Sequence, residues 1–102
     1  MDQMIASEIV EFKLVPGISD EDFIKRVEFL EAQFHSKQSG FIDTELAKGQ
    51  DGKWVMIQHW KSMAELKVVV KLMMKEPLTE SFRMALDPTS VKMQLLQQVK
   101  TW

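Results

Sequence analysis

A strand that passes directly into a helix cap is the feature that most constrains this chain. Residues 54–60, Trp-Val-Met-Ile-Gln-His-Trp, have the composition of a β-strand. A Ser-x-x-Glu capping box follows at Ser62 to Glu65, so a helix is predicted to begin at about Met63. This arrangement puts His59 next to Trp60 at the junction between strand and helix.

The residues before this strand predict a strand, a helix and the first arm of a hairpin. Alternation from Ile5 to Val15 predicts a strand with one apolar side. Ser19 begins a capping sequence, and an apolar stripe of helical period predicts a helix from near Asp20 to about Lys37. Residues 41–47 alternate again, and the turn-forming residues 48–52 join them to the strand 54–60 as a hairpin.

The residues after the capping box predict two helical pieces and a last strand. Pro77 interrupts the helical pattern, so residues 78–86 are predicted to form a second, short helix. Residues 91–102 alternate as a half-buried strand would. The side chains expected to be buried in the two helical pieces are Leu66, Val69, Val70 and Met73, followed by Leu78, Phe82 and Leu86.

The order strand, helix, strand, strand, helix, strand matches the ferredoxin-like βαββαβ plan, an α+β fold. All of residues 1–102 are expected to form one such domain, with a four-stranded antiparallel sheet and both helices on one face. The other face would expose Ile9 together with side chains from the third and last strands. Because an isolated domain seldom exposes a large apolar patch, the sequence predicts a homodimer that pairs through its sheet faces.

Composition excludes several classes of function. The formal net charge of -2, with acidic and basic residues interleaved, argues against nucleic acid as a partner. The chain has no cysteine, and its two histidines lack the spacing of metal ligands, so neither a metal nor a cofactor is predicted. No phosphate-binding glycine loop follows a strand. The acidic start Met1 to Met4 resembles neither a signal peptide nor a membrane anchor, so a cytoplasmic location without membrane binding is expected.

The segment Trp60-Lys61-Ser62-Met63-Ala64-Glu65-Leu66 resembles the dimeric α+β barrel superfamily, and within it the antibiotic-biosynthesis-monooxygenase-like (ABM-like) domains. Residues 39–42 before the hairpin and 91–93 in the last strand support this resemblance. The resemblance implies a homodimer whose sheets face each other, with a pocket between sheet and helices in each protomer. It also implies that the chain is related to cofactor-independent monooxygenases that act on polycyclic phenols and to haem-degrading enzymes.

The family's haem-degrading branch uses an Asn, a Trp and a His that would fall near Val10, Val69 and residues 78–82. None of these residue types is present there, so haem degradation is rejected. The monooxygenase branch often relies on a pocket Tyr, and the chain has no Tyr. Two hypotheses therefore stay open: a cofactor-independent monooxygenase for a small aromatic or polyketide-like molecule, and a dimeric module that binds a small molecule or is structural, without catalysis.

His59 is the first candidate for proton transfer, since histidine exchanges a proton readily near neutral pH. Glu8 shares a strand phase with Val10 and Phe12, and the first strand is expected to lie antiparallel to the third. If the phase of His59 faces the helices, Glu8 and His59 meet in the pocket, where the carboxylate would orient the imidazole as a general base. The commoner alternative is a strand-end histidine that is bonded to a backbone carbonyl or to water. His35, at the end of the first helix, is expected to have a structural or solvated role.

Residues expected to contact a small apolar or aromatic ligand come from both layers of the fold. Trp54 and Trp60 share one strand face and could stack on a flat molecule, although packing in the core or at a dimer interface is the commoner role of such a pair. The full set of predicted ligand contacts is Trp60, Trp54, Phe12, Val10 and Met73.

Overall fold

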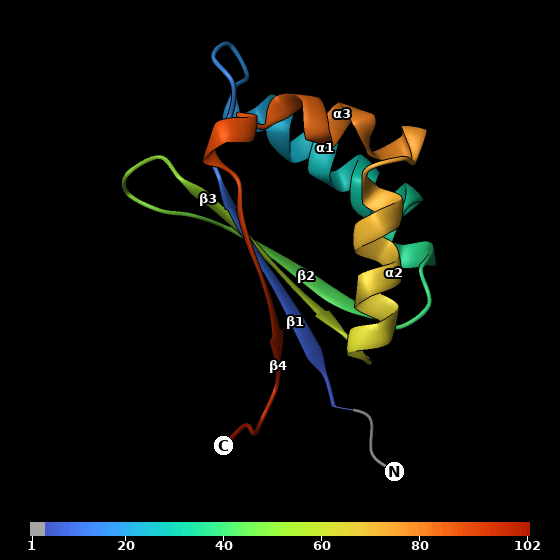
Figure 1. Cartoon of the computed structure of the whole chain (residues 1–102). Coiled ribbons are helices and arrows are strands. Elements are labelled where there is room, and N and C mark those ends of the chain that lie inside the picture. The colour runs from blue at the N-terminus through green and yellow to red at the C-terminus, as the bar shows by residue number, and fades with distance from the viewer. Residues whose placement is uncertain (1–3) are drawn as a thin grey trace.

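A computed structural model describes residues 4–102 of the protein. Its strands and α-helices follow one another in the predicted order (Figure 1). Short 3-10 turns at residues 35–37, 77–79 and 88–90 lie between them. The elements are β1 (Ala6–Phe12), α1 (Asp20–Gln33), β2 (Phe41–Lys48), β3 (Trp54–Trp60), α2 (Met63–Met73), α3 (Glu80–Ala85) and β4 (Lys92–Gln97).

The four strands form one antiparallel sheet in the order β2-β3-β1-β4. All three α-helices lie on the same side of this sheet (Figure 1). The predicted ferredoxin-like α+β fold is therefore confirmed. The predicted break after α2 is also confirmed, because Pro77 begins a 3-10 turn that leads into α3.

Serine side chains set the starts of the two longer helices. The Ser19 Oγ atom accepts a hydrogen bond from the Asp22 amide at 3.1 Å, and Ser62 Oγ accepts one from the Glu65 amide at 3.2 Å. Each serine satisfies an amide that has no partner within the first helical turn. Both helices consequently begin where the sequence predicts, α1 at Asp20 and α2 at Met63.

The core lies between the inner face of the sheet and the helices. Aromatic rings fill its centre: Phe12 contacts Phe23 edge to face at 5.5 Å between centroids, and Phe23 contacts Trp54 in the same way at 5.0 Å. The buried aliphatic side chains of the helices, Val27, Leu30, Leu66 and Val69, extend this core along α1 and α2.

The structure differs from the sequence prediction at the ends of elements. β1 stops at Phe12, and Leu14 forms only an isolated bridge with Leu86. β4 ends at Gln97, and Val99, predicted as a buried strand residue, is 88% exposed. Leu78, predicted to face inward, is 39% exposed because it lies in the 3-10 turn before α3 rather than in the helix.

The outer face of the sheet has no helix over it (Figure 1). Ile9 and Ile57 are directly opposite each other there in the central strands, and Leu96 of β4 lies opposite Ser7 on the same face. The predicted apolar outer face is therefore confirmed. Within residues 4–102, no helix combines the length and the apolar character needed to cross a membrane.

Candidate functional site

A cavity of about 750 Å³ lies between the inner face of the sheet and the helices α2 and α3. Its wall is apolar except for Glu8, His35 and Arg83. A mostly apolar wall with a few convergent polar groups is typical of a small-molecule site. The apolar wall consists of Val10, Val15, Met56, Leu66, Val69, Val70, Met73, Met74, Phe82, Met84, Leu86, Pro88, Val91 and Met93.

Glu8 brings a carboxyl group into this wall from the middle of the sheet. It lies on β1, opposite Gln58 of β3 on one side and Leu95 of β4 on the other. Burial raises the pKa of the Glu8 carboxyl above its ordinary value, and a positive charge on nearby His35 offsets part of that rise. Glu8 therefore keeps its proton to a higher pH than an exposed glutamate does.

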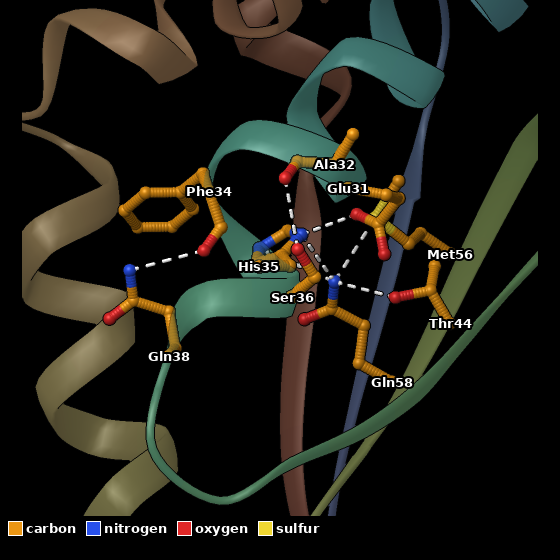
Figure 2. Close-up of polar contacts among 9 residues, drawn as sticks. All are labelled: Glu31, Ala32, Phe34, His35, Ser36, Gln38, Thr44, Met56 and Gln58. Carbon is orange, nitrogen blue, oxygen red and sulfur yellow. Dashed lines mark hydrogen bonds and ion pairs between the residues drawn. The ribbon is translucent and has the colours of Figure 1, made fainter.

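His35 begins the 3-10 turn that comes after α1, and it is only 3% exposed. Its Nδ1 atom makes a hydrogen bond with Glu31 Oε2, four residues earlier at the end of α1 (Figure 2). An ionised carboxylate can only accept, so this contact favours the tautomer in which Nδ1 carries the hydrogen and Nε2 the lone pair. The ring is also stacked on Phe41 at 6.0 Å between centroids.

Gln58 lies close to both ring nitrogens of the imidazole. Its side-chain nitrogen is 2.9 Å from Nδ1 and 3.3 Å from Nε2 of His35, and 3.1 Å from Thr44 Oγ1 (Figure 2). Because Nδ1 has a single bonding direction, which Glu31 occupies, Thr44 Oγ1 and the Nε2 lone pair are the better acceptors for the two amide hydrogens. Within residues 4–102, Glu31 Oε1 and Gln58 Oε1 are buried without a hydrogen-bond partner, so this cluster has unused acceptors next to the cavity.

Arg83 brings a permanently charged guanidinium into the cavity wall. Its Nε atom donates to Thr79 Oγ1 at 2.9 Å, and the buried Thr79 hydroxyl donates to the Met73 carbonyl at 2.7 Å. No carboxylate of residues 4–102 forms an ion pair with this guanidinium. Arg83 can consequently bind an anionic oxygen of a ligand.

The predicted contact between Glu8 and His59 is wrong. Ser7, not Glu8, is opposite His59, so the imidazole lies on the outer face of the sheet. There its Nδ1 atom is 2.7 Å from Asp43 Oδ1 of β2. Glu8 faces the helices as expected, but Gln58 is the residue beside it on that face.

The packing of β3 explains this error. Both alternate phases of the strand carry apolar residues, so the pattern alone does not decide which one faces the helices. The phase that contains Trp54 and Trp60 is buried, since two indoles remove more apolar surface from water than Val55 and Ile57 do.

The predicted ligand contacts fall into two groups. Val10 and Met73 line the cavity. Trp60, Trp54 and Phe12 are packed in the core, with exposures of 0%, 5% and 0%, and are not part of the cavity wall. Of the two roles considered for Trp54 and Trp60, packing in the core is therefore the one observed, and not contact with a ligand in the cavity.

Sequence reasoning did not place His35 at the cavity: of the structural and solvated roles expected for it, burial excludes the solvated one, and the residue lies in the cavity wall. One signal was available: Glu31 and His35 are four residues apart, the spacing at which side chains meet on a helix. Within residues 4–102, no three His, Asp or Glu side chains are grouped closely enough to hold a metal ion.

The family model described as antibiotic biosynthesis monooxygenase matches residues 6–84, and the chain belongs to this family. A search of curated proteins found no match. Among solved structures, the fold is similar to that of SnoaB, described as a cofactor-independent oxygenase from Streptomyces nogalater, with a TM-score of 0.76, 16% identity and coverage of 96% of each chain.

Two further solved structures have the same fold. Rv0793 from Mycobacterium tuberculosis gives a TM-score of 0.68 at 15% identity, over 95% of this chain and 97% of that one. A conserved protein from Methanosarcina mazei Go1 gives 0.71 at 13% identity, over 95% of each chain. At these identities the likeness shows the fold alone.

Proposed function

We propose that this protein is a cofactor-independent monooxygenase, or a closely related enzyme, that acts on a small aromatic or polyketide-like molecule in the cavity between sheet and helices. Membership of the antibiotic biosynthesis monooxygenase family supports this class of reaction. The fold shared with SnoaB, whose description names a cofactor-independent oxygenase, is consistent with it.

The observation that carries the proposal is the composition of the cavity. Its volume of about 750 Å³ is within the range of small-molecule sites, and its wall is apolar apart from Glu8, His35 and Arg83. Such a wall favours a flat, mostly apolar molecule, and the three polar side chains can orient its oxygen atoms. Five methionines in the wall, Met56, Met73, Met74, Met84 and Met93, can adapt to different ring systems.

The proposed reaction needs no group beyond substrate, protein and O₂. A base in the cavity removes a proton from an activated carbon, and the resulting enolate passes electrons to O₂ as a carbon–oxygen bond forms. Loss of water from the hydroperoxide then leaves a carbonyl. For anthrone as a probe, one anthrone and one O₂ become one anthraquinone and one water.

The test compares two variants of α2 that carry the same substitution. Val70 lines the cavity, whereas Val68 is 58% exposed and does not. Val70→Phe fills part of the cavity, and Val68→Phe is the matched control. We expect Val70→Phe to lower kcat/KM for anthrone at least about tenfold, equivalent to about 1.4 kcal/mol, with Val68→Phe unchanged.

Oxygen uptake is measured with an oxygen electrode in the presence of a metal chelator. Equal rates for the wild type and both variants would contradict catalysis in this cavity. Tight binding of anthrone without oxygen uptake would instead support the non-catalytic binding module.

We also propose that the protein is a homodimer paired through the outer faces of its sheets. The apolar side chains Ile9, Val55, Ile57 and Leu96 on that uncovered face support this arrangement. In such a dimer the two cavities lie on the far sides of the paired sheets, each inside its own protomer.

A further inference from the structure

The cavity wall contains two side chains that can exchange a proton. His35 and Glu8 both line the cavity, and Glu31 binds the Nδ1 side of the imidazole from outside the cavity wall. A carboxylate behind an imidazole fixes its tautomer and orientation, which is how a histidine base is prepared in enzymes. Glu31 and His35 are four residues apart in the sequence. Their contact is independent of the His59–Asp43 pair on the outer face of the sheet.

We propose that His35 is the base that removes a proton from the substrate, that Glu31 is the residue that positions it, and that Glu8 acts as a neutral acid. The substrate class that fits these roles is a flat, enolisable ketone bound in its neutral form. This inference rests on the proposed function, because it names the substrate class and the proton-transfer residues of the same cavity.

The roles follow from the donor and acceptor character of each group. With Nδ1–H bonded to Glu31, the Nε2 lone pair of His35 is the one that can accept a proton, and a substrate would replace the Gln58 amide that lies 3.3 Å from Nε2. A protonated Glu8 can donate a hydrogen bond to the ketone oxygen, and that bond strengthens as negative charge develops on the oxygen. Burial of Glu8 raises its pKa and so favours this protonated form.

The step is a proton transfer and needs no oxidant. The carbon–hydrogen bond next to the activated carbonyl system breaks, its electron pair enters the enolate, and the proton moves to Nε2 of His35. The enolate oxygen stays bonded to the Glu8 hydroxyl. In D₂O the reverse step returns deuterium to the carbon, so proton transfer can be observed without O₂.

The experiment measures deuterium incorporation into the methylene carbon of anthrone, under anaerobic conditions in D₂O, for the wild type and variants. His35→Gln is expected to reduce the protein-catalysed exchange at least about a hundredfold, the effect typical of losing a general base. Glu31→Gln should reduce the exchange rate at least about tenfold, because the tautomer of the His35 imidazole is then no longer fixed. Glu28→Gln, the same substitution at an exposed position of α1, is the matched control and should exchange at the wild-type rate.

The affinity for a ligand that cannot react distinguishes a structural role of Glu31 from a positioning role. Anthraquinone has no exchangeable methylene, and its dissociation constant is expected to change less than twofold in Glu31→Gln. The same variant should lose exchange rate at saturating anthrone. If His35→Gln fails to fold, the Glu31→Gln variant still tests the proposal, because Glu31 is partly exposed and lies outside the cavity wall.

The outcomes distinguish this inference from the proposed function. Catalysed exchange that depends on His35 and Glu31, in a protein that consumes no oxygen, would support the proton-transfer site and contradict the oxygenase. Oxygen uptake with wild-type exchange in both variants would overturn this inference and leave the oxygenase in place. A wild-type protein that does not accelerate exchange above the rate in buffer would also overturn it.

Discussion

At the scale of single residues, Glu8 is the side chain whose surroundings say most about the site. Alternation in the first strand was enough to predict that it faces the helices, together with Val10 and Phe12. Its partner could not be predicted in the same way, because His35 reaches the cavity from the end of α1 and no local pattern relates the two positions. Burial among apolar side chains then raises the pKa of the Glu8 carboxyl.

Glu8→Gln should change how stability depends on pH. A carboxyl whose pKa is raised on folding binds more protons in the folded than in the unfolded chain, so the free energy of unfolding falls as pH rises through the folded pKa. His35 and Arg83 are the other titratable groups of the cavity wall. The variant, which cannot ionise, is expected to unfold at a higher temperature than wild type at pH 8, with the difference shrinking toward pH 4.

Thermal unfolding followed by circular dichroism at both pH values checks this prediction. Glu28→Gln, exposed on α1, serves as the control and should follow the wild-type pH dependence. A Glu8→Gln variant less stable than wild type at pH 8 would show that ionised Glu8 stabilises the fold, contrary to the account.

At the scale of secondary-structure elements, the sequence was most informative about helix starts and least informative about β3. The serines at 19 and 62 identify the starts of α1 and α2 because a side-chain cap is a local interaction. The face on which His59 lies depends on how β3 packs against α1 and α2, which is not local. With apolar residues in both phases, β3 is suited to burial on both sides, by helices within the protomer and by a second sheet outside it.

Ile57→Lys is expected to dissociate the proposed dimer. Ile57 is in the middle of β3, opposite Ile9 on the outer face, so a lysine would bring an unpaired charge into the centre of the interface. Ile24→Lys on α1 is the matched control, since Ile24 is 41% exposed on the helix layer. Size-exclusion chromatography with light scattering should give a monomer for the first variant and a dimer for the second and for wild type.

A monomeric wild-type protein, or an Ile57→Lys variant that remains a dimer, would refute pairing through this face. Circular dichroism of both variants is needed beside the mass measurement, because a change of oligomeric state carries meaning only if the fold is retained.

At the scale of the whole molecule, the cavity results from the way the helices cover the sheet. α2 ends at Met73, and the 3-10 turn that begins at Pro77 redirects the chain into α3, so side chains of both helices line the cavity together with residues of β1, β3 and β4. The sequence predicted the break at Pro77, and it singled out Val10 and Met73, which line the cavity. It could not predict the open volume, which depends on how all the wall side chains pack together.

The location of ligand binding is the most direct test of the account, because both the proposed function and the proton-transfer site require it. We would titrate protein labelled at its valine, leucine and methionine methyl groups with 1,8-dihydroxyanthraquinone, a flat ligand that cannot be turned over, and follow the methyl NMR spectrum. We expect shifts at Val70, Met73 and Val10 in the cavity, with Val55 and Leu96 on the outer face unchanged. Shifts confined to Val55 and Leu96, or none at all, would contradict this expectation.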